Sequence, residues 1–235
     1  MLFANLLFKE LVSDGKFEPT ILLKNIDEAV KCNIKKLVLA PAYYDEESKT
    51  SIKEVENMVE ELNLHLKEKE IDLTVYPANL LRDNYENIKS YISGNLGSIN
   101  NSKYVLLDIE ECNKIDDILE IVFEYMLRNI TPIIVAPERI EEIIKDNKKI
   151  EKLIKEGCLF QLDPASLEGI YGKTVKKAAK ALIKKDIYKF IGFQEEIDRN
   201  LINTQTINIS KKSLFILKQE GEITRKTIGN KKSKF

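Results

Sequence analysis

The sequence predicts an α/β fold in which parallel strands alternate with helices, and three observations lead to it. Seven short apolar runs recur along the 235 residues, and most of them are nearly continuous in Val, Ile and Leu. Such runs are typical of parallel strands that are covered on both faces. Longer amphipathic stretches separate the runs, and 43% hydrophobic residues are enough to bury a substantial core. The sheet built in this way either closes into a barrel or stays open.

The expected strands are these seven runs, taken in order. They cover residues 2–7, 36–40, 72–76, 104–109, 132–136, 158–162 and 188–192. If the sheet closes, the polar residues that follow the strands meet at one mouth, because the carboxyl ends of parallel strands lie at the same end of a barrel.

The expected helices lie between the strands. They cover residues 52–70, 115–127, 140–154 and 165–183. In the first of them, Val55, Val59 and Leu62 recur at three- and four-residue steps, which is the spacing of one helix face. Residues 93–102, rich in Gly, Asn and Ser, are the clearest loop.

The chain is expected to form one domain with a balanced surface charge. The barrel covers residues 1–203, and residues 204–235 add a peripheral segment that ends in a basic tail. With 37 Lys plus Arg against 38 Asp plus Glu, nothing favours nucleic acid or an anionic membrane in general. The tail is the exception, either as a solvated end or as a binding segment. Its lysines are Lys226, Lys231, Lys232 and Lys234.

Cysteine usage and the first residues indicate a cytoplasmic protein without membrane insertion. Cys32, Cys112 and Cys158 lie far apart and form no CxxC pair, which fits a reducing compartment. The apolar start of the chain is too short to span a bilayer, and it lacks the basic region and cleavage site of a signal peptide. We expect it to form the first strand.

The single histidine excludes several kinds of site. His65 falls within an expected helix with no second His or nearby Cys, so a histidine-built metal centre has no support. A Ser-His-Asp or Cys-His nucleophile would have to use His65, and no nucleophile elbow (GxSxG) accompanies it. The phosphate-binding patterns GxGxxG and GxxxxGK[ST] are absent as well, so dinucleotide and P-loop nucleotide sites have no support.

Five segments resemble one known family, in the family's own order and spacing. They are Ser13-Asp14-Gly15, APAYY at 40–44, SKYVLLD at 102–108, NITPIIVAPER at 129–139 and QLDPASLEGIYGK at 161–173. Together they are similar to the manganese-dependent tyrosine phosphatases of bacterial capsule and exopolysaccharide operons, which belong to the polymerase-and-histidinol-phosphatase (PHP) class. The resemblance covers about residues 1 to 200 and implies a distorted (β/α)7 barrel of the PHP type.

The resemblance also implies a metal cluster, whose ligand positions have changed in this chain. Only Asp108 keeps a carboxylate, and Glu195 supplies one in place of an imidazole. These two residues could hold at most one hard ion, Mg²⁺ or Mn²⁺, through water, so no resident cofactor is expected. The remaining ligand positions fall on Asn5, Leu7, Ala42, Asn79, Ala136 and Phe193, the last within about one residue.

Two arginines stand where the family places cations on the phosphate. Arg139 and Arg199 are therefore candidates for a remaining phosphate- or phosphotyrosine-binding pocket, because a guanidinium binds phosphate through two parallel hydrogen bonds. An alternative is that Arg139 pairs with a neighbouring carboxylate at the barrel rim. Tyr43 and Tyr44 are expected to line the same mouth or to pack against it.

The leading hypothesis is a catalytically degenerate relative of these phosphatases that acts as a binding or regulatory protein in capsule or exopolysaccharide biosynthesis. The partners implied are a phosphotyrosine protein or tyrosine autokinase, and another copy of the chain or a paralogue. One alternative is an active phosphatase with a carboxylate site rebuilt around Asp108 and Glu195. Another is a structural subunit that assembles with an active paralogue.

Overall fold

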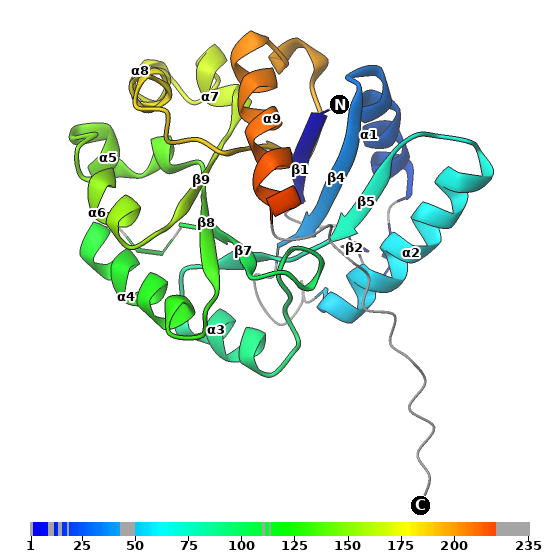
Figure 1. Ribbon diagram of the computed structural model, residues 1–235, viewed down its shortest axis with the longest axis horizontal. Helices are drawn as coiled ribbons and strands as arrows, with labels where there is room; N and C mark the ends of the chain where they lie inside the picture. Colours follow the sequence, from blue (N-terminus) through cyan, green and yellow to red (C-terminus); the bar gives the residue numbers. More distant parts are fainter. Residues whose placement is uncertain are drawn as a thin grey trace, which may run out of the picture.

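The fold is built on one sheet of eight parallel strands, curled so that its helices lie on the outside (Figure 1). The computed structural model describes residues 2–8, 12–13, 16–17, 19–42, 50–109, 111–112 and 114–219. The strand order in the sheet is β5-β4-β1-β10-β9-β8-β7-β6. The strands are β1 (Leu2–Phe8), β4 (Ile34–Pro41), β5 (Thr74–Pro77), β6 (Leu80–Arg82), β7 (Tyr104–Asp108), β8 (Thr131–Val135), β9 (Leu159–Leu162) and β10 (Phe190–Gln194), and the short β2 (Val12–Ser13) and β3 (Lys16–Phe17) form a separate antiparallel pair.

The two ends of the sheet are consecutive pieces of the chain. β5 pairs with β4, and after two residues β6 continues in the same direction and pairs with β7. A parallel bridge between Ala42 and Leu80 ties the end of β4 to β6. β5 and β6 therefore act as one bent strand that joins both ends of the sheet, which gives the seven strand positions that the sequence predicts. This matches the expected barrel of the PHP type.

The helices follow the strands and cover the outer face of the sheet (Figure 1). Two expected helices are each split in two. The prediction of one helix over 140–154 was wrong, because Asp146 has an extended backbone there, and the prediction over 165–183 was wrong because Gly169 and Gly172 adopt positive φ. The helices are α1 (Pro19–Lys31), α2 (Ile52–Glu68), α3 (Tyr85–Ile92), α4 (Ile115–Met126), α5 (Glu141–Lys145), α6 (Ile150–Lys155), α7 (Pro164–Glu168), α8 (Lys173–Lys184) and α9 (Thr204–Gln219).

Alternating side chains along the strands build two separate apolar layers, because successive residues of a strand point to opposite faces. The larger layer lies between the sheet and the helices and contains, for example, Leu6 and Ile191. The smaller layer is called the inner cluster below. It consists of Leu7, Val38, Ala40, Ala42, Ala78, Leu80, Ile99, Tyr104, Leu106, Ile133, Val135, Ala136 and Phe190.

The peripheral segment expected after residue 203 begins with α9, which packs against β1 and β10. Thr206, Ile209 and Ser210 of this helix are buried. None of the described helices combines the length and the apolar character needed to cross a membrane. Several residues of interest lie outside the described part of the chain, namely Asp14, Gly15, Tyr43, Tyr44 and the tail lysines 226, 231, 232 and 234.

Candidate functional site

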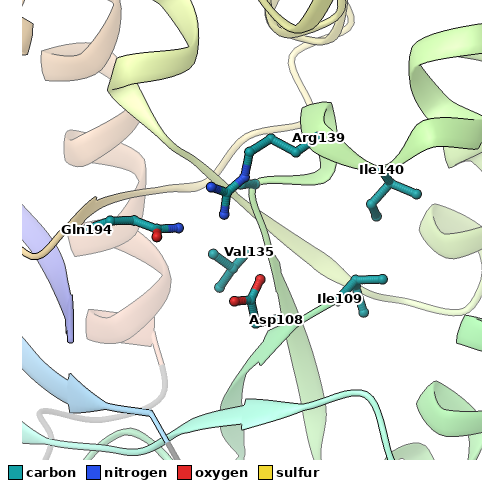
Figure 2. A pocket seen from close by; sticks show the side chains of 7 residues that line it. Asp108, Ile109, Val135, Arg139, Ile140 and Gln194 are labelled. Atoms are coloured by element: carbon teal, nitrogen blue, oxygen red, sulfur yellow. The ribbon is translucent and has the colours of Figure 1, made fainter. Parts of the chain in front are cut away.

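A small cavity opens at the carboxyl ends of β7, β8 and β10, the end of a parallel barrel at which ligands bind (Figure 2). Its volume is about 120 Å³, which is far below the several hundred Å³ of a site that encloses a drug-sized ligand. The Asp108 carboxylate and the Arg139 guanidinium point toward each other across it, and the Gln194 amide lies beside them. The lining residues are Asp108, Ile109, Val135, Ala136, Arg139, Ile140 and Gln194.

A single helical turn after β8 holds Arg139 at the cavity. Ala136 adopts φ 44° and ψ 53°, a left-handed conformation that a non-glycine residue rarely takes, and Pro137 starts the turn. Glu138 points the other way and is fully buried. Its carboxylate accepts hydrogen bonds from the Tyr188 hydroxyl at 2.8 Å and from the backbone N–H of Asp163 at 3.1 Å. Glu138 thus joins the turn to the end of β9, and this fixes the direction of Arg139.

Among the described residues, the Arg139 guanidinium contacts three other side chains. With its amide oxygen turned toward the guanidinium, Gln194 accepts from Nη2 at 2.6 Å and from Nη1 at 3.2 Å. The carboxylate of Asp163 lies 3.9 Å from Nη1, and the Tyr171 ring packs under the guanidinium at 5.0 Å. A guanidinium carries five N–H donors, so these contacts leave donors for a ligand in the cavity. The alternative expectation, that Arg139 pairs with a neighbouring carboxylate, is met by Asp163, and Arg139 lines the cavity as well.

Burial shifts the pKa of the acidic groups around this arginine. It raises the pKa of Glu138 to about 7, against hydrogen bonds that lower it. The pKa of Asp163 is also raised by burial, although Arg139 opposes the shift. Burial and the facing Asp163 carboxylate raise the pKa of Tyr171 to about 12. Tyr171 is therefore a neutral hydrogen-bond donor at physiological pH.

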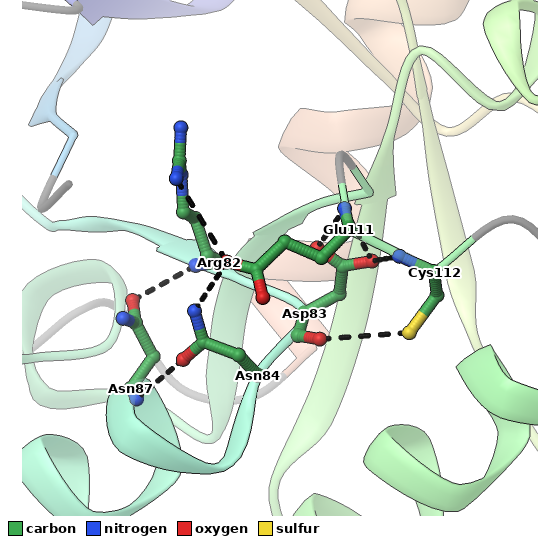
Figure 3. A network of polar contacts seen from close by, with 6 residues as sticks. All are labelled: Arg82, Asp83, Asn84, Asn87, Glu111 and Cys112. Carbon is green, nitrogen blue, oxygen red and sulfur yellow. Dashed lines mark hydrogen bonds and ion pairs between the residues drawn. The ribbon is translucent and has the colours of Figure 1, made fainter.

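A network of polar contacts orders the chain next to Asp108 (Figure 3). The Asp83 carboxylate accepts from the backbone N–H of Glu111 at 3.0 Å and of Cys112 at 2.6 Å. The Glu111 carboxylate in turn accepts from the Asn84 amide at 2.6 Å and lies 3.8 Å from Nη1 of Arg82. Since Arg82 pairs in register with Asp108, a second arginine lies at the strand ends, although it does not line the cavity.

Four of the ligand positions that the family resemblance implies lie in the barrel interior, at Asn5, Leu7, Ala42 and Ala136. Leu7, Ala42 and Ala136 are buried members of the inner cluster. Asn5 is fully buried, and its amide donates to the Gln161 side chain inside the barrel. The alkyl side chains fill space, whereas Asn5 is bound through its amide N–H to Gln161 and leaves its side-chain oxygen without a partner among the described residues.

The ligand position that falls on Asn79 links two loops in this chain. Asn79 is 0% exposed. Its amide donates to the backbone oxygen of Thr50 at 2.9 Å, and its side-chain oxygen accepts from the N–H of Gly97 at 2.9 Å. Both ends of the side chain are used, and they link two loops at the mouth.

The residues present do not fit the metal cluster that the family resemblance implies. Alkyl side chains have no lone pair to donate to a metal, and manganese requires oxygen or nitrogen ligands. Within the described residues, no three His, Cys, Asp or Glu side chains lie close enough together to hold an ion. We therefore derive no chemical step through a metal.

The other predicted site residues lie apart from the cavity. Glu195 is exposed and its backbone is hydrogen-bonded to Leu7 and Asn25, but it does not line the cavity with Asp108. Arg199 is exposed near Glu28 and Cys32 of the α1 segment, so the structure does not bring it to Arg139. His65 is exposed on α2.

Sequence reasoning missed Gln194, Tyr171 and Arg82 as residues of the mouth. Phe193, which was aligned to a ligand position, belongs to the outer apolar layer. Its neighbour Gln194 faces the cavity, as the alternation along β10 requires. The sequence contained a pattern that could have indicated this, because Phe190 and Gly192 precede Gln194 at two-residue steps and therefore lie on the same face of the strand. Arg82 gave no signal because its three-residue strand was not predicted.

The family of the chain follows from a comparison of its sequence with family profiles. The profile described as capsular polysaccharide synthesis, CpsB/CapC, matches residues 10–228. The chain belongs to the CpsB/CapC family.

Relatives of this CpsB/CapC member confirm the sequence resemblance. The tyrosine-protein phosphatase YwqE of Bacillus subtilis (strain 168) is 23% identical over 209 residues, which cover 89% of this chain and 80% of that protein. CapC of Staphylococcus aureus is 24% identical over 181 residues, 77% of this chain and 71% of CapC.

Solved structures confirm the fold. A crystal structure from the pair YwqE of Bacillus subtilis and CpsB of Streptococcus pneumoniae, described as metal-dependent tyrosine phosphatases, aligns with a TM-score of 0.70 and 22% identity. It covers 92% of this chain and 86% of that one. The histidinol phosphate phosphatase of Lactococcus lactis aligns with a TM-score of 0.52 and 9% identity over 94% of each chain. At these identities the likeness shows the barrel fold alone.

Proposed function

We propose that this CpsB/CapC protein is a phosphate-recognising binding or regulatory protein that does not perform metal-dependent hydrolysis. Its role belongs to capsule or exopolysaccharide biosynthesis, and its ligand is the phosphoryl group of a phosphotyrosine protein such as a tyrosine autokinase. The observation that carries the proposal is the replacement of ligand positions by apolar core at Leu7, Ala42 and Ala136. A buried alkyl group in the inner cluster cannot become a metal ligand by any change of rotamer.

Recognition of phosphate is supported by the way Arg139 is held. Its direction is fixed by the turn that Glu138 anchors and by the Tyr171 ring that packs against the guanidinium. Such a preorganised guanidinium loses little conformational freedom when it binds an anion. The cavity of about 120 Å³ has room for a group of phosphate size, since about 10–15 Å³ of such volume is enough for one water.

The competing function is a phosphatase with a rebuilt carboxylate site. It would need Asp108 and Glu195 to hold one ion together. Such an ion would supply the nucleophile by lowering the pKa of a bound water. Asp108 lines the cavity and is buried, whereas Glu195 is exposed and lies outside the lining. The geometry therefore favours the binding protein.

The deciding experiment measures metal content, hydrolysis and phosphate binding on the same purified protein. We expect no stoichiometric manganese, no release of phosphate from a phosphotyrosine peptide, and binding of that peptide that is lost in Arg139→Gln. Stoichiometric manganese together with hydrolysis that disappears in Asp108→Ala would overturn the proposal in favour of the rebuilt enzyme.

A further inference from the structure

The helix α8 carries an unusually one-sided charge. Its twelve residues include five lysines and no acidic residue. Its apolar face, with Val175, Ala179 and Leu182, is buried against the barrel. On the opposite side four exposed lysines follow one another at steps of four, three and four residues, which places them in one row along the helix. This row, called the lysine stripe below, consists of Lys173, Lys177, Lys180 and Lys184.

The charges of the lysine stripe are not balanced within the described part of the chain. Two other lysines, one on the helix and one just after its end, make other contacts: Lys176 donates to the backbone oxygen of Glu168, and Lys185 pairs with Glu151. No residue of the stripe forms an ion pair with a described residue. Like charges at these spacings destabilise a helix, and Lys173 also opposes the helix dipole because it lies in the first turn. An external anion would relieve this repulsion.

The lysine stripe begins close to the cavity that Arg139 lines. The link between α7 and α8 contains Ile170, which is 65% exposed, and Tyr171, which is 37% exposed. Tyr171 lies under the guanidinium of Arg139, and Lys173 follows two residues later. The cavity of about 120 Å³ is too small to enclose a peptide, so most of a bound peptide has to lie outside it. The exposed Ile170 and Tyr171 side chains provide a surface that leads from the cavity to the stripe.

We propose that the lysine stripe binds acidic residues that flank a phosphotyrosine in a partner protein, while Arg139 binds the phosphoryl group. This inference rests on the proposed function and names the class of partner, an acidic phosphopeptide. The stripe is about 16 Å long from Lys173 to Lys184, which matches about five residues of extended peptide. Tyr171 connects the stripe to the cavity, and this favours a peptide over an anionic membrane. A membrane surface would contact the stripe without using the cavity.

The test compares three peptides in a binding titration at low salt. One has phosphotyrosine between two runs of four glutamates, one has it between runs of four serines, and one has the glutamates around an unphosphorylated tyrosine. The variant is Lys177→Gln/Lys180→Gln, which preserves helix propensity because Gln and Lys are similar in this respect. Its matched control is Lys53→Gln/Lys67→Gln on α2, where two exposed lysines are changed elsewhere.

We expect the acidic phosphopeptide to bind about three- to tenfold more tightly than the serine phosphopeptide, as several exposed ion pairs would give. The stripe variant should lose most of this preference without weakening the serine peptide, and the control variant should keep it. Equal affinity of both phosphopeptides, or a preference that survives in the stripe variant, would overturn the inference while the proposed function stands.

Two further outcomes separate the inference from the proposed function. If the glutamates raise the affinity and phosphorylation does not change it, the proposed phosphate recognition is wrong. The proposal that Arg139 and the lysine stripe bind one peptide together is then wrong as well. If the stripe variant loses binding to vesicles of phosphatidylglycerol and phosphatidylcholine but keeps its peptide preference, the stripe is a membrane surface and the peptide assignment is wrong.

Discussion

Arg139 and Asp108 face the same small cavity with opposite charges, and this pair decides what the cavity binds. A phosphate placed there meets an attractive guanidinium and a repulsive carboxylate at short range. In a true metal site the carboxylate would help, because a cation would stand between it and the phosphate. The sign of the effect of Asp108 on phosphate binding therefore separates a binding protein from a metalloenzyme.

The substitution Asp108→Asn should raise the affinity for inorganic phosphate by about threefold or more, since each 1.4 kcal/mol of repulsion removed is a factor of ten. Asn keeps the shape of the side chain and removes its charge. The affinity can be measured by calorimetric titration, with Arg139→Gln as the variant expected to lose binding. Weaker phosphate binding in Asp108→Asn would contradict this and favour a cation at the carboxylate.

Glu138 supports Arg139 from a fully buried position, and its raised pKa makes the fold sensitive to pH. A carboxyl group with a folded-state pKa of about 7 binds its proton more tightly in the folded protein than in the unfolded chain. Its contribution to stability is complete below the ordinary pKa of 4.5 and is lost as the pH rises through about 7.

The variant Glu138→Gln should remove this pH dependence. Its free energy of unfolding, relative to that of the unsubstituted protein, should increase by up to about 3 kcal/mol between pH 5 and pH 8, at about 1.4 kcal/mol per pKa unit. Gln can still accept from the N–H of Asp163 and contact the Tyr188 hydroxyl. Urea unfolding at both pH values measures the difference. A difference that does not change with pH would show that Glu138 is ionised in the folded protein.

At the scale of elements, the inside of the barrel depends on a close approach between β9 and β10. Gln161 lies across Gly192 and accepts from the amide of Asn5, and a Cβ atom at Gly192 would overlap the Gln161 amide. Since β10 carries Gln194 to the cavity, this packing also sets the position of the site.

Gly192→Ala should lower the free energy of unfolding by about 1–3 kcal/mol, the usual effect of overpacking a core. The control is a double-mutant cycle with Gln161→Ala, which removes the side chain that the new methyl group meets. Thermal or urea unfolding of the four proteins gives the coupling. If the two effects simply add, the overlap with Gln161 is not the cause of the loss.

The sequence predicted these elements well where the pattern is local and less well where it is not. The seven apolar runs appear as strands because burial on both faces selects Val, Ile and Leu directly. The break between β5 and β6 was missed, since only pairing with two different neighbours separates residues 74–77 from 80–82. The sequence alignment placed the ligand position on Phe193 and not on its neighbour Gln194 for a similar reason. A shift of one residue along a strand reverses which side chains face the cavity.

At the scale of the whole molecule, the barrel is stabilised from within by apolar packing at positions that could otherwise carry charge. The inner cluster includes Leu7, Ala42 and Ala136, and beside it the Asn5 amide donates to the Gln161 side chain. A barrel with several histidines and carboxylates at these positions would need a metal to offset their burial. This one should be as stable without a metal as with it.

The thermal midpoint of unfolding should therefore be the same, within about 1 °C, with excess manganese and with a chelator. A metal bound to the folded state at one hundred times its Kd would add about 2.7 kcal/mol, which corresponds to a shift of about 5–10 °C in a domain of this size. The matched control is Asp108→Asn, because Asp108 is the carboxylate that lines the cavity. A saturable rise of several degrees in the unsubstituted protein, absent in Asp108→Asn, would establish a metal site at Asp108. It would also move the proposed function toward the enzyme.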